Sequence, residues 1–417
     1  MQENPCLINN ENVIIKNLFN EILKLGNIFK NRDILKSSYV PEFLPHRDKE
    51  IKALAVMLRP ALNFETPFNI LISGKPGTGK TAVTRLISRL FSEKSKIIFV
   101  YQNAQIIDTQ YRVLQNIAEN LNEKLPFTGL PTDEVYKKTI KIIDKNKCNL
   151  ILIIDEADKL KNDGVLYTLS RINENLQYSK VSLILIANDM HFIDFYDARI
   201  KSSLNLEYLL FRPYDANELI DILQSRATMA LQPNVLEKDV IPLCSALAAQ
   251  EHGDARKALD LFLMSAELAE RTKSNKITTK HVILAHNKLE DDRLKEVVNN
   301  LPSQMKIVLY SILKIDIKNK KKKVNGRITT GEVYNMYDIL SKKIGIKVLT
   351  QRRVADLISE LESIGIISTR VISKGRGGRT RDISVTSSKK EIMSILQKDD
   401  IINNFSNLTI KDQARLF

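Results

Sequence analysis

The chain has 417 residues, enough for two or three domains of the usual ~100–200 residues. It carries 63 basic and 49 acidic residues, and the net charge of +14 favours a polyanionic partner, nucleic acid first and an acidic membrane surface second. An ordinarily basic soluble enzyme is the alternative on charge alone. The sequence lacks a signal-peptide pattern, an apolar run of ~20 residues and any C-x-x-C pair, which argues against secretion, a membrane span, a disulfide framework and a zinc site.

The N-terminal region has two recognisable segments. An amphipathic pattern at 13–23 predicts a helix that packs on the first domain or on a partner. The prolines in segment 39–47 force an extended path, and a helix is expected at 48–58. Extended segments shortly before a phosphate-binding strand commonly wrap the base of a nucleotide, with Val40 as the candidate contact here. A plain connector is equally compatible with the pattern.

Residues 74–81, GKPGTGKT, follow the apolar run 68–73 and precede a helical pattern. Strand, glycine-rich loop and helix is the context that a phosphate-binding loop requires, because glycines and the helix start present N–H groups to an anion. Lys80 is expected at the β- and γ-phosphates of ATP and Thr81 at Mg²⁺. A plain turn between strand and helix is the alternative. The predicted nucleotide contacts here are Gly74, Pro76, Gly77, Thr78, Gly79, Lys80, Thr81, Ala82 and Val83.

An all-apolar strand at 150–154 ends in Asp155 and Glu156. A carboxylate at such a strand end is costly unless it meets a cation, so this is interpreted as a Walker-B pattern. Asp155 is expected to orient Mg²⁺, and Glu156 to activate the attacking water. An acidic helix N-cap is the alternative. Asn188, at the end of strand 181–187, should lie near the γ-phosphate, because parallel strands present working residues at their carboxyl ends.

Alternating patterns predict a parallel α/β sheet covered on both faces, with strands near 68–73, 97–101, 150–154, 181–187 and 206–211. Helical patterns at 109–122 and 132–147 form an insertion before the third of these strands. From 213 to about 290 the pattern is wholly helical, at 213–228, 235–250, 254–272 and 278–290. Arg256, at the start of the third of these helices, either faces solvent or reaches a phosphate.

The C-terminal part predicts a winged helix-turn-helix. A short link at 291–301 is followed by a helix to about 315, a basic loop at 318–323 and further helices and strands at 329–344, 350–363, 366–372 and 382–385. The helix at 350–363 would be the recognition helix. Its apolar residues are spaced to face the core, so Gln351, Arg352 and Arg353 are expected to face a DNA groove. The glycine-rich turn supplies contacts to phosphate or the minor groove from Lys374, Arg376, Arg379 and Arg381. Winged helices also serve as protein-interaction modules.

Several motifs occur together in this order: GKPGTGKT, IIDEAD, IAND, RIKSS, FRPYDANEL, GDARKALDLF and the terminal winged helix. From about residue 30 to 395, the chain resembles the archaeal origin-recognition initiators, AAA+ ATPases related to eukaryotic origin-recognition and Cdc-type loading proteins. The resemblance implies an α/β AAA+ P-loop core, a helical lid and a winged helix. The implied ranges are an N-terminal extension at 1–30, the core at 31–212 with an insertion at about 105–140, the lid at 213–292, the winged helix at 300–395 and a tail at 396–417.

The resemblance also implies residue roles. Asn188 matches sensor 1 and Arg256 matches sensor 2, which reads the γ-phosphate, while Tyr214 and Arg226 match positions near the nucleotide. The insertion tip, Phe127, Thr128 and Gly129, matches a region that touches DNA. Arg199 lies where AAA+ proteins carry an arginine finger, but many relatives have it four residues later, where this chain has Ser203. A finger that acts on a neighbour's nucleotide therefore stays open.

The function implied is a weak ATPase that acts as a nucleotide switch with ATP/ADP and Mg²⁺. It would bind double-stranded origin DNA and help recruit or load the replicative MCM helicase, together with other initiator paralogues. The implied location is the cytoplasm, at the nucleoid, without a membrane partner. Two alternatives remain: an AAA+ winged-helix transcriptional regulator and a DNA-dependent, clamp-loader-like ATPase. Strong stimulation of ATP turnover by DNA would favour the clamp-loader-like ATPase, and tight retention of the bound nucleotide would favour the initiator.

Overall fold

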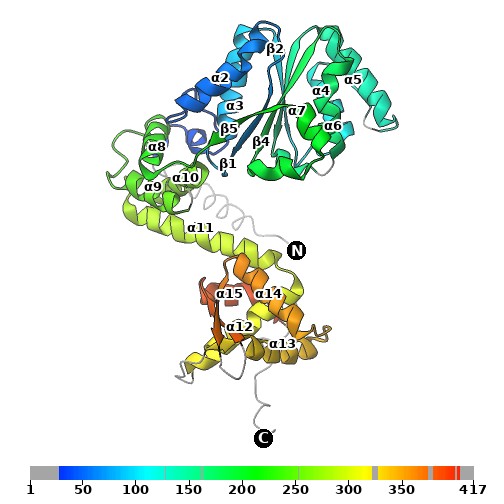
Figure 1. The fold of residues 1–417 in the computed structure, drawn as a ribbon. Coiled ribbons are helices and arrows are strands. Elements are labelled where there is room, and N and C mark those ends of the chain that lie inside the picture. The colour runs from blue at the N-terminus through cyan, green and yellow to red at the C-terminus, as the bar shows by residue number, and fades with distance from the viewer. Residues whose placement is uncertain are drawn as a thin grey trace, which may run out of the picture. The chain divides into compact units, whose positions relative to one another are not determined.

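The computed structural model describes residues 28–126, 128–160, 163–251, 253–321, 327–373, 379–399 and 402–403. The chain divides into two compact units, residues 1–285 and 286–417, and each is described by itself (Figure 1). The helix predicted at 13–23 lies outside the described residues. None of the helices in the described ranges is long and apolar enough to cross a bilayer.

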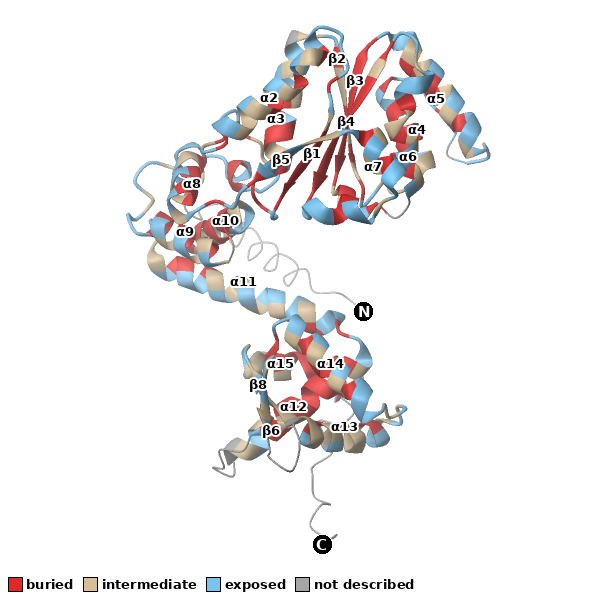
Figure 2. Cartoon of the chain, viewed as in Figure 1, coloured by how far each residue is buried: buried red, intermediate tan, exposed pale blue. Residues whose placement is uncertain are grey.

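A parallel sheet of five strands forms the centre of the first unit, in the order β2-β3-β4-β1-β5. The strands are β1 (Asn69–Gly74), β2 (Ile97–Asn103), β3 (Asn149–Asp155), β4 (Lys180–Ala187) and β5 (Leu206–Phe211). The central strands are continuous apolar runs, and they are buried along almost their whole length (Figure 2). That pattern is the one expected of a parallel sheet covered on both faces.

Helices cover both faces because side chains alternate along each strand. On one face, Ile151 and Ile153 pack with α2 (Asp48–Leu62) and α3 (Lys80–Lys94). On the other face, Leu150 and Leu152 pack with the helices α4 (Gln110–Asn120), α5 (Thr132–Asn146), α6 (Asp163–Ser170) and α7 (Ala198–Leu204). Short 3₁₀ turns complete this part: η1 (Arg32–Leu35), η2 (Ala157–Lys159), η3 (Ile172–Asn175) and η4 (Met190–Phe195).

The parallel register brings the carboxyl ends of the strands to one edge of the sheet. Asn103 lies beside Asp155, and Asp155 lies beside Ile186 on the next strand. Ser73, just before the glycine-rich loop, pairs with Ala187. The loop after β1, the carboxylate after β3 and the amide after β4 therefore meet at this edge, where ligands bind in open α/β sheets.

The rest of the first unit is helical, as predicted. The helices are α8 (Ala216–Ala230), α9 (Val240–Gln250) and α10 (Ala255–Arg271), and α11 (Thr279–Asn300) begins in this unit and continues past its last residue, Ala285. A capping box between Asp215 and Glu218 starts α8. The link predicted at 291–301 is wrong, because α11 continues to Asn300. Neither glycine nor proline interrupts the chain before Pro302, so nothing ends the helix earlier.

The second unit has the elements of a winged helix. Its helices are α12 (Ser303–Lys321), α13 (Thr330–Ile344), α14 (Gln351–Ser363) and α15 (Lys389–Leu396). Its antiparallel sheet has the order β6-β8-β7, formed by β6 (Ile328–Thr329), β7 (Ile367–Ser373) and β8 (Arg379–Val385). Residues 318–321 of the predicted basic loop are instead helical, because α12 extends to Lys321, and residues 322 and 323 lie outside the described residues. The α/β, helical and winged-helix fold class is thus confirmed.

Candidate functional site

The glycine-rich loop packs tightly against the helical part of the first unit. Gly77 has φ +72°, and a Cβ built there would lie 1.6 Å from Oδ1 of Asp254, the N-cap of α10. Gly79 has φ +91°, and its Cβ would lie 2.9 Å from the hydroxyl oxygen of Tyr214. These positions need glycine both for the backbone conformation and for the close approach. A further contact, from Ala255 N to Gly77 O at 3.2 Å, joins α10 to the loop.

Lys80 is held under this loop by three oxygens. Its ammonium donates to Gly74 O at 2.6 Å, Lys75 O at 2.9 Å and Asn188 Oδ1 at 3.0 Å. The predicted lysine and the predicted sensor asparagine are therefore brought into contact. Burial and the nearby positive charge of Arg256 lower the pKa of Lys80 to about 8. A polyphosphate would supply the negative charge that this buried ammonium lacks.

Asp155 accepts hydrogen bonds on both oxygens. Thr81 Oγ1 donates to Oδ2 at 2.8 Å, and the hydroxyl of Tyr101 donates to the same oxygen at 2.7 Å. The other oxygen, Oδ1, accepts from Glu156 N at 2.9 Å. Burial and the bond to Asp155 raise the pKa of Tyr101 to about 12, so its hydroxyl stays a donor. A threonine hydroxyl beside a carboxylate is the oxygen donor set that Mg²⁺ prefers, so these residues fit the predicted metal.

Glu156 has an unusual backbone and an unsatisfied side chain. Its φ is +56°, in the left-handed region that glutamate rarely adopts. Its Oε2 atom is buried, and no hydrogen-bond partner for it exists among the described residues. Backbone strain and a buried carboxylate oxygen without a partner are features of residues that contact a ligand or a water molecule. Glu156 has both features at the end of β3.

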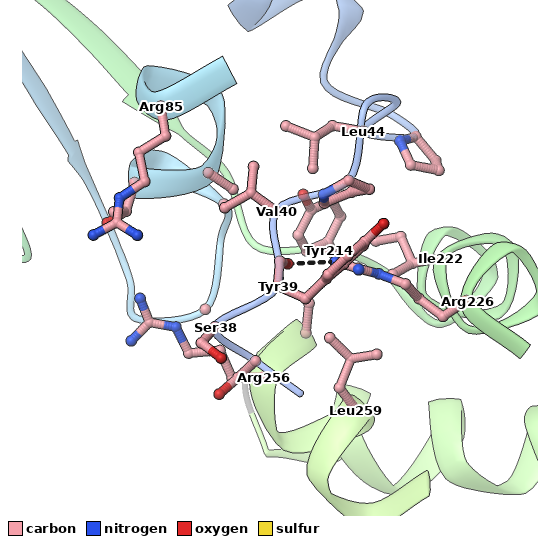
Figure 3. Close-up of a pocket in the computed structure, with 18 of the residues that line it drawn as sticks. Ser38, Tyr39, Val40, Leu44, Arg85, Tyr214, Ile222, Arg226, Arg256 and Leu259 are labelled. Carbon is pink, nitrogen blue, oxygen red and sulfur yellow. Dashed lines mark hydrogen bonds between the residues drawn. The ribbon is translucent and has the colours of Figure 1, made fainter. Parts of the chain in front are cut away.

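A cavity of roughly 360 Å³ adjoins Thr81, Asp155 and Glu156, whereas Lys80 and Asn188 do not line it (Figure 3). Segment 37–45 forms one wall, and apolar side chains from Val40, Leu44, Ile222 and Leu259 are part of the lining. Gly77, Gly79, Thr81, Ala82, Asp155 and Glu156 line the side toward the sheet. An apolar wall opposite a phosphate-type loop can accept a planar base at one end and charged groups at the other.

Helices α8 and α10 contribute two arginines to this cavity. Arg256 lines it, which favours the phosphate-facing alternative of the sequence over the solvent-facing one (Figure 3). Arg226 donates to Ile34 O at 3.1 Å and Tyr39 O at 3.0 Å, and its guanidinium lies 4.9 Å from the centre of the Tyr39 ring. Arg226 thus holds segment 37–45 in place as well as lining the cavity.

The remaining predicted contacts of the loop lie farther from the cavity. Thr78 is buried, and its hydroxyl donates to Lys75 O at 2.8 Å. The side chain of Val83 belongs to the hydrophobic core between α3 and the sheet. Neither these two residues nor Gly74 and Pro76 line the cavity, so a ligand would meet them only through the loop backbone.

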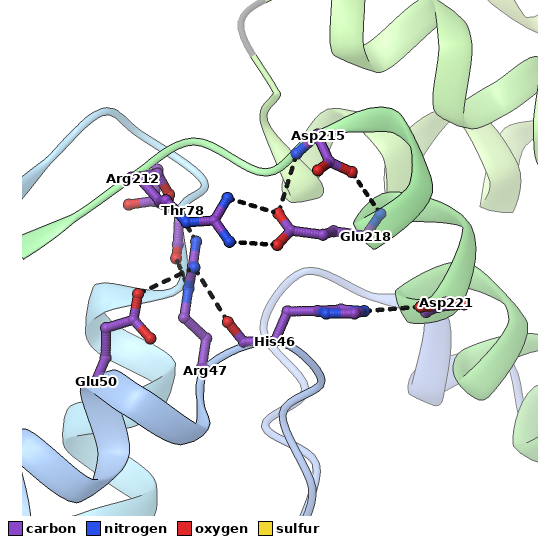
Figure 4. Close-up of polar contacts among 8 residues, drawn as sticks. All are labelled: His46, Arg47, Glu50, Thr78, Arg212, Asp215, Glu218 and Asp221. Atoms are coloured by element: carbon purple, nitrogen blue, oxygen red, sulfur yellow. Dashed lines mark hydrogen bonds and ion pairs between the residues drawn. The ribbon is translucent and has the colours of Figure 1, made fainter.

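Arg47 is a central residue that the sequence did not reveal (Figure 4). It is fully buried, and its guanidinium donates to Thr78 O at 2.9 Å, to Arg212 O at 2.7 Å and to Glu50 at 3.2 Å. The same group lies 3.8 Å from the centre of the Tyr214 ring. Arg47 therefore joins the glycine-rich loop to the segment that leads into α8. No motif marks it, because its partners are brought together only by folding.

The predicted arginine finger lies apart from these groups. The side chain of Arg199 is 78% exposed and pairs with Asp197 at 3.2 Å. Arg199 does not line the cavity. A role toward another subunit's nucleotide stays a prediction.

The winged-helix prediction places three polar side chains at the start of α14. Gln351, Arg352 and Arg353 are all exposed, while the buried residues of α14 are Val354, Leu357, Ile358 and Leu361. Arg353 lies 3.8 Å from Asp356 and from Glu360. The first turn of this helix is therefore open to a partner along most of its polar edge.

The other predicted DNA contacts are only partly within the described residues. Phe127, Lys374 and Arg376 lie outside them, as does the side chain of Arg379. Arg381, on β8, donates to Ser359 of α14 at 2.5 Å. Thr128 and Gly129 are exposed at the turn between α4 and α5. Whether these residues contact DNA stays a prediction.

Family models match the chain in three successive regions. An AAA domain matches residues 65–193, a Cdc6 AAA+ ATPase-type lid domain matches 220–287, and a CDC6 C-terminal winged helix domain matches 296–395. The ORC1-type DNA replication protein 1 of Methanosarcina mazei is 49% identical over 389 residues, which cover 92% of this chain and 93% of that protein. The ORC1-type DNA replication protein of Pyrococcus abyssi is 44% identical over 419 residues, with coverage of 97% and 98%.

Solved structures show the same likeness. The Aeropyrum pernix ORC1 protein, solved in complex with DNA, is 40% identical with a TM-score of 0.75, over 91% of this chain and 99% of that chain. The ORC2 protein of the same organism, solved in ADPNP–ADP complexes, shares the fold at 20% identity and a TM-score of 0.59, over 91% and 100% of the two chains.

Proposed function

The chain belongs to the ORC1-type DNA replication proteins, and from that premise we propose that it is an ATP-dependent initiator that binds double-stranded origin DNA. The observation that carries this proposal is the exposed, basic first turn of α14 in a chain 40% identical to an ORC1 protein solved with DNA. The winged helix and the insertion tip at Thr128 and Gly129 are the proposed DNA contacts. Charge supplies affinity, and Gln351 and Arg352 supply limited base reading.

The cavity is the proposed nucleotide site. Lys80 would pair with the phosphates of ATP, and Asn188 and Arg256 would contact the γ-phosphate from the sheet and from α10. Glu156 would accept a proton from the attacking water. Bound Mg²⁺, held by Thr81 and Asp155, would neutralise phosphate charge. The AAA domain and the open carboxylate of Glu156 support these assignments.

We expect ATP turnover to be weak, so that the bound nucleotide acts mainly as a switch. The support is that Arg199 pairs with Asp197 of its own chain and that Ser203 occupies the more common finger position. An arginine finger accelerates hydrolysis by ~10³–10⁵ where it is present. The contacts of α10 with the glycine-rich loop, at Gly77 and Asp254, offer a route by which the nucleotide state changes the angle of the helical lid.

The biological role proposed is to mark a replication origin in the cytoplasm, at the nucleoid, and to help recruit or load the replicative MCM helicase with other initiator paralogues. Mapping the protein on its own genome tests this role. Occupancy at one or a few replication starts supports it, whereas occupancy at many promoters would favour a transcriptional regulator.

DNA recognition is tested by footprinting on origin duplex. Arg352→Ala should lose about 1–3 kcal/mol of discrimination for its base pair. Lys398→Ala removes the same charge from an exposed position after α15 and serves as the matched control. Equal protection of random and origin duplex by the unaltered protein, or equal effects of the two substitutions, would contradict recognition through α14.

A further inference from the structure

A second recess lies on the first unit, apart from the nucleotide cavity. It is lined by α5 and by the loop that joins η3 to β4, and it shares no residue with the nucleotide cavity. Its lining includes Lys147, two residues before the start of β3, whereas the lining of the nucleotide cavity includes Asp155, at the end of that strand. A strand of seven residues separates the two by about 20 Å.

The recess is rich in lysine and tyrosine. Lys137, Lys141 and Lys145 follow one another at four-residue intervals along α5, and Lys147 stands just after the helix. Each interval advances about 6 Å along the helix, so the ammonium groups form a line rather than a single point. No ion pair within the described residues involves Lys137 or Lys141, whereas Lys145 pairs with Glu123 at 2.8 Å.

Aromatic and amide groups form the opposite wall. The side chain of Tyr178 is exposed, and Lys147 Nζ lies 5.4 Å from the centre of its ring. Asn175 Nδ2 of this wall donates a hydrogen bond at 2.9 Å to the hydroxyl of Tyr136, which belongs to α5 on the lysine side. Gln177 adds a second amide to this wall. The recess therefore combines cations with a ring face and side chains that can both donate and accept hydrogen bonds.

Asp144 makes the recess a built feature of the fold. Its carboxylate accepts backbone hydrogen bonds from Gln177 at 2.8 Å and from Tyr178 and Ser179 at 3.0 Å. These bonds tie the loop of Tyr178 to α5 and set the ring beside the line of lysines. The four lysines of the lining outnumber this one carboxylate, so the recess carries an excess of positive charge.

We propose that this recess binds single-stranded DNA, with the lysines of α5 along its phosphates and Tyr178 stacked on a base. A linear polyanion matches the line of ammonium groups, and charge complementarity alone would also suit an acidic peptide or duplex DNA. The exposed ring favours the unpaired strand, because a base stacks on a tyrosine face only when it is free of its own duplex.

This inference rests on the proposed function as an initiator that binds duplex DNA. It adds single-stranded DNA as a second ligand. The predicted insertion tip at Thr128 and Gly129 precedes α5, whereas the recess is lined by α5 from Tyr136 onward. Lys141 stands nine residues after Thr132, about 14 Å along the helix, so the recess contacts a different stretch of nucleic acid from the tip. Opening of a duplex at an origin would supply the unpaired strand.

The test measures binding of fluorescently labelled oligo-dT and of an origin duplex of the same length, by anisotropy across a salt series. Lys137→Gln with Lys141→Gln should weaken oligo-dT binding by about 10- to 30-fold at 0.1 M salt. The slope of log K against log salt should fall by about 1.4, since each lost phosphate contact removes about 0.7. Duplex binding should change less than twofold.

A matched control removes the same charge elsewhere. Lys138→Gln with Lys238→Gln alters exposed or partly exposed lysines that do not line the recess, and it should leave oligo-dT binding within twofold of the unaltered protein. Equal losses in the two double variants would overturn the proposal, because the effect would then be one of net charge. A loss of duplex binding as large as that of oligo-dT, or displacement of oligo-dT by polyglutamate at lower concentration than by unlabelled oligo-dT, would also overturn it.

Stacking is tested separately from charge. Tyr178→Ala should weaken oligo-dT binding about tenfold and remove the fluorescence quenching of a 2-aminopurine placed in the strand. Tyr178→Phe should restore both, because phenylalanine keeps the ring face. Failure of the phenylalanine variant to restore quenching would refute stacking. Failure of the unaltered protein to bind origin duplex would instead refute the proposed function. Binding of oligo-dT and its loss in the variants would still decide whether the recess binds single-stranded DNA.

Discussion

The pKa of Lys80 leads to a quantitative prediction about nucleotide binding. In the nucleotide-free protein, burial and then Arg256 lower this pKa to about 8, so that about half of the lysine is neutral at pH 8. ATP phosphates would stabilise the ammonium, so the pKa of Lys80 should be higher in the complex than in the free protein. The complex then binds more protons than the free protein, so ATP affinity must fall as pH rises through about 8.

The magnitude follows from the fraction of charged lysine. That fraction is about nine-tenths at pH 7 and about one-tenth at pH 9, so the Kd for ATP should rise about tenfold, equivalent to about 1.4 kcal/mol. Tyr101 does not contribute, because its pKa is raised to about 12. Calorimetry in buffers of different ionisation enthalpy should show uptake of about half a proton on binding at pH 8.

Two variants give the controls. Lys80→Arg keeps its charge throughout this range, so its ATP affinity, whatever its value, should be flat between pH 7 and 9. Arg256→Ala removes a charge that lowers the pKa of Lys80, and the midpoint should move to higher pH. A Kd for ATP that is unchanged between pH 7 and 9 in the unaltered protein would refute the reasoning, as would an equal pH dependence in Lys80→Arg.

Two further predictions concern contacts around the cavity. Tyr101→Phe removes one of the two hydroxyls that donate to Oδ2 of Asp155, and so removes a competitor of Mg²⁺ for this oxygen. Mg²⁺ should then support ATP binding at about fivefold lower concentration. An unchanged or higher Mg²⁺ requirement in a titration would contradict this competition. Gly77→Ala places a Cβ against Asp254 and should lower the free energy of unfolding by about 2–4 kcal/mol and weaken ATP binding. Gly129→Ala is the control, because Gly129 also has positive φ but no atom lies within 4 Å of the added Cβ. This variant should lose about 1 kcal/mol of unfolding free energy, measured by thermal unfolding. Equal losses in the two variants would show that backbone strain alone matters at Gly77.

Patterns within short stretches of sequence determined much of the fold. The apolar runs at β3 and β4, the glycine loop before α3 and the alternation of strands with helices were sufficient to predict a parallel sheet with a phosphate-type loop. The prediction that Asn188 lies near the phosphates rested on parallel strands ending at the same edge, and its contact with Lys80 was found only in the structure. Errors occurred at element ends, as at α11, where polar residues resembled a link but no residue breaks the helix.

The tertiary structure alone decided which side chains meet across long separations in the chain. Arg47 bonds to a carbonyl 165 residues away, and Tyr101 shares an oxygen of Asp155 with Thr81 from a neighbouring strand. No motif marks Arg47 or Tyr101. A local sequence pattern predicts whether a segment is a helix, a strand or a turn, but not the partner against which the segment packs. The sequence by itself determined a loop that can hold phosphates. Only folding brought Asp254 against Gly77 and so coupled that loop to the helical lid.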